Sequence, residues 1–214
     1  TLIDSHCHID GEQFDADRDE VVRRARDAGA VAMLNVGTGD PRTDDFRRAV
    51  AVAERYENVF ASVGVHPHDA KLYDDRAEEH LIELVRSSEK VIAWGEIGLD
   101  HYYDHSPREV QREVFRRQIR TARELNLPII VHSRDADDET VEILTEEFPV
   151  STGGGAILSD SSKLTAEGCN LENSYQPSAI SRKPTAGIMH CFGGTPKMAE
   201  DLMAIGFIIS FAGN

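Results

Sequence analysis

The stretch Leu2-Ile3-Asp4-Ser5-His6-Cys7-His8 begins with a short apolar run and ends in two histidines separated by one residue. Side chains at positions i and i+2 of an extended segment point the same way, so His6 and His8 can bind one metal ion together. A histidine pair alone also fits a solvated turn. An open doubly wound sheet would instead carry a glycine-rich nucleotide-binding turn after its first strand. Because the active sites of barrels gather at the carboxyl ends of the strands, this stretch favours a TIM-type (β/α) barrel.

The rest of the chain repeats the same alternation of short apolar runs and longer amphipathic segments. Continuous apolarity in the short runs is typical of parallel strands that are covered on both faces. The predicted strands are Leu2–Ile3, Val31–Val36, Val59–Val65, Val91–Trp94, Pro128–Val131, Gly187–Met189 and Phe207–Phe211. Helical spacing and terminal signals predict helices near 21–29, 46–53, 81–85, 106–125 and 195–206. In the fourth of these, Ser106 is predicted to cap, Pro107 to occupy the first helical position and Glu109 to complete a capping box.

The length and composition bound the class of protein. The chain has 214 residues, slightly fewer than the roughly 250 of a typical TIM barrel. Its net charge of −15 argues against a protein that holds nucleic acid by overall basicity. That charge does not exclude a nuclease that uses bound metal ions and a few local Arg and Lys side chains. Residues 150–185, rich in Ser, Gly, Asn and Pro, are predicted to be an inserted surface loop in a single domain spanning 1–214.

The three cysteines contain no CxxC pair, which favours free thiols in a reducing compartment. The chain begins directly with a predicted strand rather than a basic and apolar leader. No apolar run approaches the roughly 20 residues of a membrane helix. We therefore expect a cytoplasmic protein without a membrane partner or an evident stable protein partner.

Ionisable residues follow three further predicted strands. Glu96 follows the fourth strand between Gly95 and Gly98, which allow close approach, and this position suits a carboxylate that bridges two metals. His132 follows the fifth strand and His190 the sixth. Singly, such residues also fit a solvent-facing loop glutamate or satisfied core histidines. Together they predict a metal site, and mixed His and carboxylate ligands accept Mg, Mn or Zn.

Five segments resemble the TatD-like family of metal-dependent deoxyribonucleases: LIDSHCHID (2–10), VGVHPHDA (63–70), GEIGLDHYYD (95–104), IIVHSRDA (129–136) and IMHCFGG (188–194). They occur in the family's order over nearly the whole chain, apart from the Ser/Gly/Pro-rich segment. The resemblance implies a TIM-type barrel, one or two divalent ions, and cleavage of DNA phosphodiester bonds by metal-activated water.

The resemblance also implies a role for each matching residue. His6 and His8 match ligands of a first metal ion, and Glu96 matches the catalytic carboxylate that bridges two ions. His132 and His190 match ligands of the second ion.

Three further residues are implied to contact substrate. The resemblance places His66 and His68 at the margin of the site, although a structural turn around Pro67 is an alternative. Arg134 has a planar fork that suits a phosphate, or it pairs with a neighbouring aspartate.

The family pattern also contains an aspartate in an E-T-D-x-P-type segment after an eighth strand, and these 214 residues contain no such segment. We therefore expect a barrel that lacks its eighth strand, with a weakened first metal site. Two alternatives to a DNA nuclease stay open. One is an amidohydrolase-like barrel acting on a small amide, an ester or an aminoacyl-tRNA, although Glu96 stands where a bridging carbamate would need lysine. The other is an inactive truncated product.

Overall fold

The computed structural model describes residues 2–103, 105–149 and 186–211. Its strands are β1 Leu2–Cys7, β2 Ala30–Val36, β3 Val59–Val63, β4 Val91–Asp100, β5 Ile129–Arg134, β6 Gly187–Met189 and β7 Phe207–Ile209. Its α-helices are α1 Arg18–Asp27, α2 Asp45–Arg55, α3 Asp75–Ser87, α4 Arg108–Glu124, α5 Asp137–Glu147 and α6 Pro196–Ala204. Two 3₁₀ helices, η1 Glu12–Phe14 and η2 Pro67–Leu72, follow β1 and β3.

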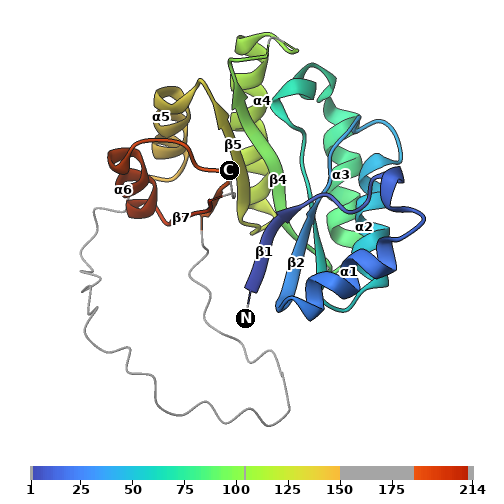
Figure 1. Cartoon of the computed structure of the whole chain (residues 1–214). Helices are drawn as coiled ribbons and strands as arrows, with labels where there is room; N and C mark the ends of the chain where they lie inside the picture. The colour runs from blue at the N-terminus through green and yellow to red at the C-terminus, as the bar shows by residue number, and fades with distance from the viewer. Residues whose placement is uncertain (1, 104, 150–185, 212–214) are drawn as a thin grey trace.

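Within the described residues, seven strands form one parallel sheet in the order β1-β2-β3-β4-β5-β6-β7. Each strand pairs with the next one along the chain, and Figure 1 shows the sheet curling while the helices pack along its outer side. This is the strand order of a (β/α) barrel, and it confirms the predicted fold class with seven strands in the part of the chain that the structure describes. All carboxyl ends of the strands therefore lie at one end of the barrel.

Two apolar layers hold the curled sheet. The larger layer lies between the sheet and the helices and includes the fully buried Phe46, Trp94 and Phe115. A smaller cluster contains Leu34 and Val36 of β2, Ala93 of β4 and Ile130 of β5, with the partly buried Phe60 of β3 packed against it. Because successive side chains of a strand alternate between the two faces of a sheet, strands covered on both sides are apolar throughout. This explains why apolar runs located the inner strands, whereas Leu2 and Ile3 of β1 and Ile208 of β7 are exposed although their runs also located strands.

The boundaries of some elements differ from the predicted ones. β4 was predicted to end at Trp94 but continues to Asp100, so Glu96 lies inside a strand rather than after it. Its pairing with β5 shifts in register between Trp94 and Ile97. Glycine and a carboxylate interrupt the apolar run there, which is why the pattern understated the strand.

The predicted capping box at the start of α4 is wrong. Pro107 occupies the N-cap position and makes no side-chain cap, and the helix begins at Arg108. The Ser106 hydroxyl is buried instead, where it donates to the His68 carbonyl at 2.7 Å and accepts the Lys71 N–H at 3.2 Å. Tertiary partners therefore satisfy this serine in place of the helix terminus. α6, by contrast, begins at Pro196, close to the predicted start, and is capped by Thr195 Oγ, which accepts the Met198 N–H at 3.2 Å.

The predicted inserted loop at 150–185 lies outside the described residues, as does Cys169. Cys7 and Cys191 are both free thiols. Among the described helices, none combines the length and the apolarity that crossing a membrane would require.

The close approach of β4 and β5 generates a prediction. A Cβ on Gly98, whose φ is +146°, would lie 2.0 Å from the His132 carbonyl oxygen. Gly98→Ala should therefore lower the free energy of unfolding by about 2–5 kcal/mol through backbone strain and overpacking. Gly29 has φ +101° but nothing within 4 Å of an added Cβ, so Gly29→Ala should cost only about 1 kcal/mol. Urea unfolding of both variants in a chelator checks this, and equal losses would contradict it.

Candidate metal centre

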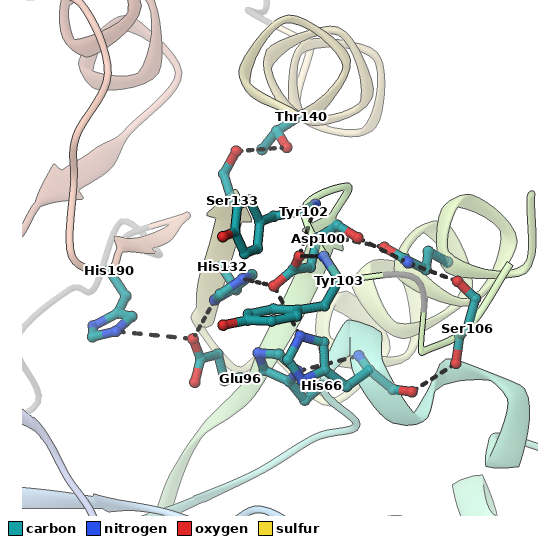
Figure 2. A network of polar contacts seen from close by, with 12 residues as sticks. His66, Glu96, Asp100, Tyr102, Tyr103, Ser106, His132, Ser133, Thr140 and His190 are labelled. Atoms are coloured by element: carbon teal, nitrogen blue, oxygen red, sulfur yellow. Dashed lines mark hydrogen bonds and ion pairs between the residues drawn. The ribbon is translucent and has the colours of Figure 1, made fainter. Parts of the chain in front are cut away.

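Side chains of β1, β4 and β5, together with His190 just after β6, meet at the carboxyl end of the sheet. Figure 2 shows Glu96, His132 and His190 of this group. The Glu96 carboxylate of β4 lies 3.0 Å from His132 Nδ1 and 3.9 Å from His190 Nε2. His6 Nε2 approaches the same carboxylate at 3.5 Å, and the rings of His6 and His190 stack with centroids 3.5 Å apart. A cavity of about 370 Å³ opens beside His6 and His190. The structure thus brings together ionisable residues separated by up to 184 positions in the chain.

Glu96 is buried with an exposure of only 5%. Burial by itself raises the pKa of Glu96, but the hydrogen bond with His132 and the nearby His6 and His66 lower it to about 2. The carboxylate is therefore ionised. The flanking glycines act as the sequence suggested, because a Cβ on Gly95 would lie 2.6 Å from the Ile130 carbonyl oxygen.

One group of possible ligands consists of His6, His8 and Glu96. His8 Nδ1 lies 2.8 Å from the Val36 carbonyl oxygen. A carbonyl only accepts, so Nδ1 carries the hydrogen and the neutral ring keeps a lone pair on Nε2. That lone pair faces His6 Nε2 at 3.1 Å. Two imidazole nitrogens and a carboxylate thus converge on one point.

A second group consists of His66, Glu96 and His132. His132 Nε2 lies 3.2 Å from Asp100 Oδ2, while its Nδ1 faces Glu96. A neutral imidazole carries one hydrogen and can donate to only one of these two carboxylates. Burial lowers the pKa of His132, but its hydrogen bonds to Glu96 and Asp100 outweigh burial and raise it. A cation on Nδ1 would satisfy the same geometry as a proton.

His6, His66 and His190 are held in the neutral form that metal binding requires. Burial lowers the pKa of His6 to about 4 and that of His66 to about 3. Burial also lowers the pKa of His190. At neutral pH these rings therefore present lone pairs rather than positive charges.

The donor chemistry fits a divalent metal. Neutral imidazoles and one carboxylate shared by both groups are ligands that zinc and other transition metals accept. In addition, the buried Nδ1 of His6 has no hydrogen-bond partner among the described residues. The five residues predicted from the sequence as ligands therefore lie together, and Glu96 belongs to both groups of possible ligands.

Asp100 is a site residue that the sequence reasoning missed. It is fully buried, and its Oδ2 accepts from His68 Nε2 at 2.8 Å as well as facing His132. Its Oδ1 accepts the backbone N–H groups of Tyr102 and Tyr103 at 3.0 Å and 2.9 Å. A ligand histidine commonly donates its second ring N–H to a carboxylate, which fixes its tautomer and orientation. The position of Asp100, four residues after Glu96 at the end of the same strand, was the available signal.

The residues implied to bind substrate lie in different surroundings. His66 belongs to the second ligand group rather than to the margin, with its ring centroid 4.5 Å from that of His132. His68 is hydrogen-bonded to Asp100. The Arg134 guanidinium lies over the rings of Tyr102 and Tyr103, at 4.3 Å and 4.9 Å from their centroids.

The barrel-type sheet and the histidine and carboxylate groups at its carboxyl end define a metal-binding (β/α) barrel. The sequence profile described as TatD related DNase matches residues 3–214. The chain therefore belongs to the TatD related DNase family, as its motifs predicted.

Individual relatives agree. The uncharacterized metal-dependent hydrolase YabD of Bacillus subtilis is 37% identical over 99% of this chain and 69% of its own length. The 3'-5' ssDNA/RNA exonuclease TatD of Cronobacter sakazakii is 33% identical over 99% of this chain and 66% of its own length. The crystal structure of YjjV, a TatD homologue from Escherichia coli, superposes with a TM-score of 0.74 at 27% identity, covering 97% of this chain and 66% of that one. The chain thus spans about two thirds of the length of these relatives.

The contacts of Asp100 generate a second prediction. Asp100→Asn keeps an oxygen for the Tyr102 and Tyr103 N–H groups but replaces the other acceptor with a donor that cannot pair with His132 Nε2–H. Removing such a carboxylate typically weakens metal affinity about 10- to 100-fold. Calorimetric titration with Zn²⁺ or Mn²⁺ measures the effect.

Asp137→Asn is the matched control for Asp100→Asn. Asp137 begins α5, shortly after the neighbouring strand β5, and its carboxylate accepts from the Ser133 hydroxyl. We expect its metal affinity to match that of the unmodified chain. Equal affinities for both variants would show that Asp100 does not orient a ligand.

Proposed function

We propose that this chain hydrolyses phosphodiester bonds of DNA with divalent metal ions. The observation that carries the proposal is the single buried Glu96 carboxylate shared by two groups of potential ligands. Such sharing is the arrangement expected for two adjacent ions that act on one phosphate. The relative named as a 3'-5' ssDNA/RNA exonuclease supports nucleic acid as the substrate class.

The proposed ligands follow from the geometry. His6 and His8 hold one ion with Glu96, while His132 holds a second ion with the same carboxylate, next to His190 and His66. When bound, divalent ions activate water and stabilise charge on a phosphate and its leaving oxygen. The protein contributes the charge of Glu96, the neutral state of His6, His66 and His190, and the orientation of His132 by Asp100. The free thiols Cys7 and Cys191 support a cytoplasmic location.

The test is hydrolysis of a 3'- or 5'-labelled oligonucleotide with Mg²⁺, Mn²⁺ or Zn²⁺ added after chelation. Glu96→Gln removes the charge shared by both ligand groups, so we expect hydrolysis to fall by about 100-fold or more, by analogy with loss of one stabilising group in other active sites. Bound metal should fall with it.

The matched control for Glu96→Gln is Glu113→Gln, which removes one charge from an exposed position of α4. It should leave hydrolysis and metal content unchanged. Near-normal hydrolysis by Glu96→Gln, or no hydrolysis of any oligonucleotide by the unmodified chain with each metal, would overturn the proposal.

A further inference from the structure

Two adjacent tyrosines lie exposed beside the candidate metal centre. Tyr102 is 58% exposed and Tyr103 is 40% exposed, although both follow directly after the buried end of β4. Aromatic side chains contribute a large apolar area to a core when they are buried. Two neighbouring rings left in solvent next to a site therefore indicate a surface that contacts a ligand.

The exposed rings are joined to a cation. Arg134 ends β5, where its backbone lies opposite Asp100 in the parallel register. The Arg134 guanidinium lies 4.3 Å and 4.9 Å from the centroids of Tyr102 and Tyr103, within the range of a cation–π interaction. The two tyrosine rings meet edge to face, with centroids 4.7 Å apart at 85°. This contact keeps a positive charge on the rings at a surface of an otherwise acidic chain.

A histidine extends the surface. The exposed ring of His105 is within 12° of parallel to that of Tyr103, with centroids 5.5 Å apart. We call Tyr102, Tyr103, His105 and Arg134 the aromatic platform. His68 joins the aromatic platform to the metal centre. Its ring and that of Tyr103 meet edge to face with centroids 5.5 Å apart, and its Nε2 is hydrogen-bonded to Asp100.

Asp100 fixes the aromatic platform relative to the ligands. One oxygen of its carboxylate accepts the N–H groups of Tyr102 and Tyr103, and the other faces His132. Figure 2 shows both tyrosines beside Asp100 and His132. The platform is therefore preorganised and needs little ordering when a ligand binds.

We propose that the aromatic platform stacks a nucleobase of single-stranded nucleic acid whose phosphate lies at the metal centre. This inference rests on the proposed function and names a base-binding subsite for it. Every base has a π-face that stacks on aromatic rings, and a guanidinium adds charge for the adjoining phosphate. In a duplex the base faces are covered by their neighbours, so stacking on the platform requires a base that is already unpaired or is extruded at a cost. The platform accordingly favours single strands over duplexes.

Binding of a short fluorescent single-stranded oligonucleotide, measured by anisotropy in a chelator so that no hydrolysis occurs, tests the proposal. Tyr102→Ala and Tyr103→Ala should each raise Kd roughly tenfold, the typical effect of losing one base–aromatic stack. Tyr102→Phe and Tyr103→Phe keep the rings and should bind normally. A duplex of the same sequence should bind the unmodified chain more weakly than the single strand does. The duplex should bind the alanine variants as weakly as it binds the unmodified chain.

Charge has its own control. Arg134→Ala should weaken binding, whereas Arg86→Ala, which removes a positive charge from the last turn of α3 at the opposite end of the barrel, should not. Thermal unfolding of each variant verifies that it is folded.

An oligonucleotide with abasic positions separates stacking from other effects. It should bind the unmodified chain as weakly as the intact oligonucleotide binds the alanine variants. When the abasic oligonucleotide is combined with an alanine variant, the loss of affinity from the missing base and the loss from the missing ring should not add. Unchanged Kd in both folded alanine variants, or losses that add fully, would overturn the subsite.

The subsite and the proposed function can fail separately. If the unmodified chain hydrolyses oligonucleotides while the alanine variants bind and hydrolyse normally, the subsite is wrong and the nuclease assignment stands. If the alanine variants lose binding while the unmodified chain hydrolyses no oligonucleotide with any metal, the subsite stands and the nuclease assignment is wrong.

Discussion

The Glu96 carboxylate is 5% exposed, and an ionised carboxylate removed from water costs several kcal/mol unless partners compensate it. Here the compensation comes from histidines on three other strands rather than from Arg or Lys. Neutral imidazoles compensate a negative charge incompletely, since each has one hydrogen to donate. His8 has already committed its hydrogen to the Val36 carbonyl, and His132 lies between two carboxylates, Glu96 and Asp100. Divalent cations would bind the imidazole lone pairs around Glu96 and compensate its negative charge. The arrangement of the site fits this compensation.

To bring Glu96 and His132 together, β4 and β5 approach each other more closely than side chains normally permit. Gly95 and Gly98 provide the space, because any Cβ there would collide with the backbone of β5. The same approach brings the Asp100 carboxylate within 3.2 Å of His132 Nε2. The side chain of Gln111, from α4, holds Asp100 by hydrogen bonds to both its backbone N–H and its carbonyl. Through Gln111 and Asp100, α4 therefore helps to fix the orientation of His132. Loosening this contact would disturb the metal ligands before it disturbed the sheet as a whole.

The sequence predicted the strands well because a short continuous apolar run is a local property, and it located even β1, whose Leu2 and Ile3 are exposed. Helix α5 was not predicted because its apolar periodicity is weak. Two of its four buried residues, Thr140 and Glu147, are polar. The capping box failed at Ser106 because a residue 38 positions away in sequence satisfies the hydroxyl. For the site, strand-end positions located the clustered histidines and Glu96. They missed Asp100 because the predicted fourth strand ended at Trp94 rather than at Asp100. They could not reveal the contact of Arg134 with two tyrosines, since that contact depends on the register between β4 and β5.

An acidic chain and a polyanionic substrate are compatible when the relevant charges are local. The net charge is −15, but at physiological ionic strength exposed charges are screened beyond about 8 Å. A phosphate at the metal centre would respond to bound divalent ions and to Arg134, not to distant carboxylates on α1 or α3. The acidic surface would still repel nucleic acid that is not engaged at the centre. Affinity in the proposed activity would then come from stacking and metal contacts rather than from counterion release, so its salt dependence should be shallower than that of proteins that bind DNA through a basic surface.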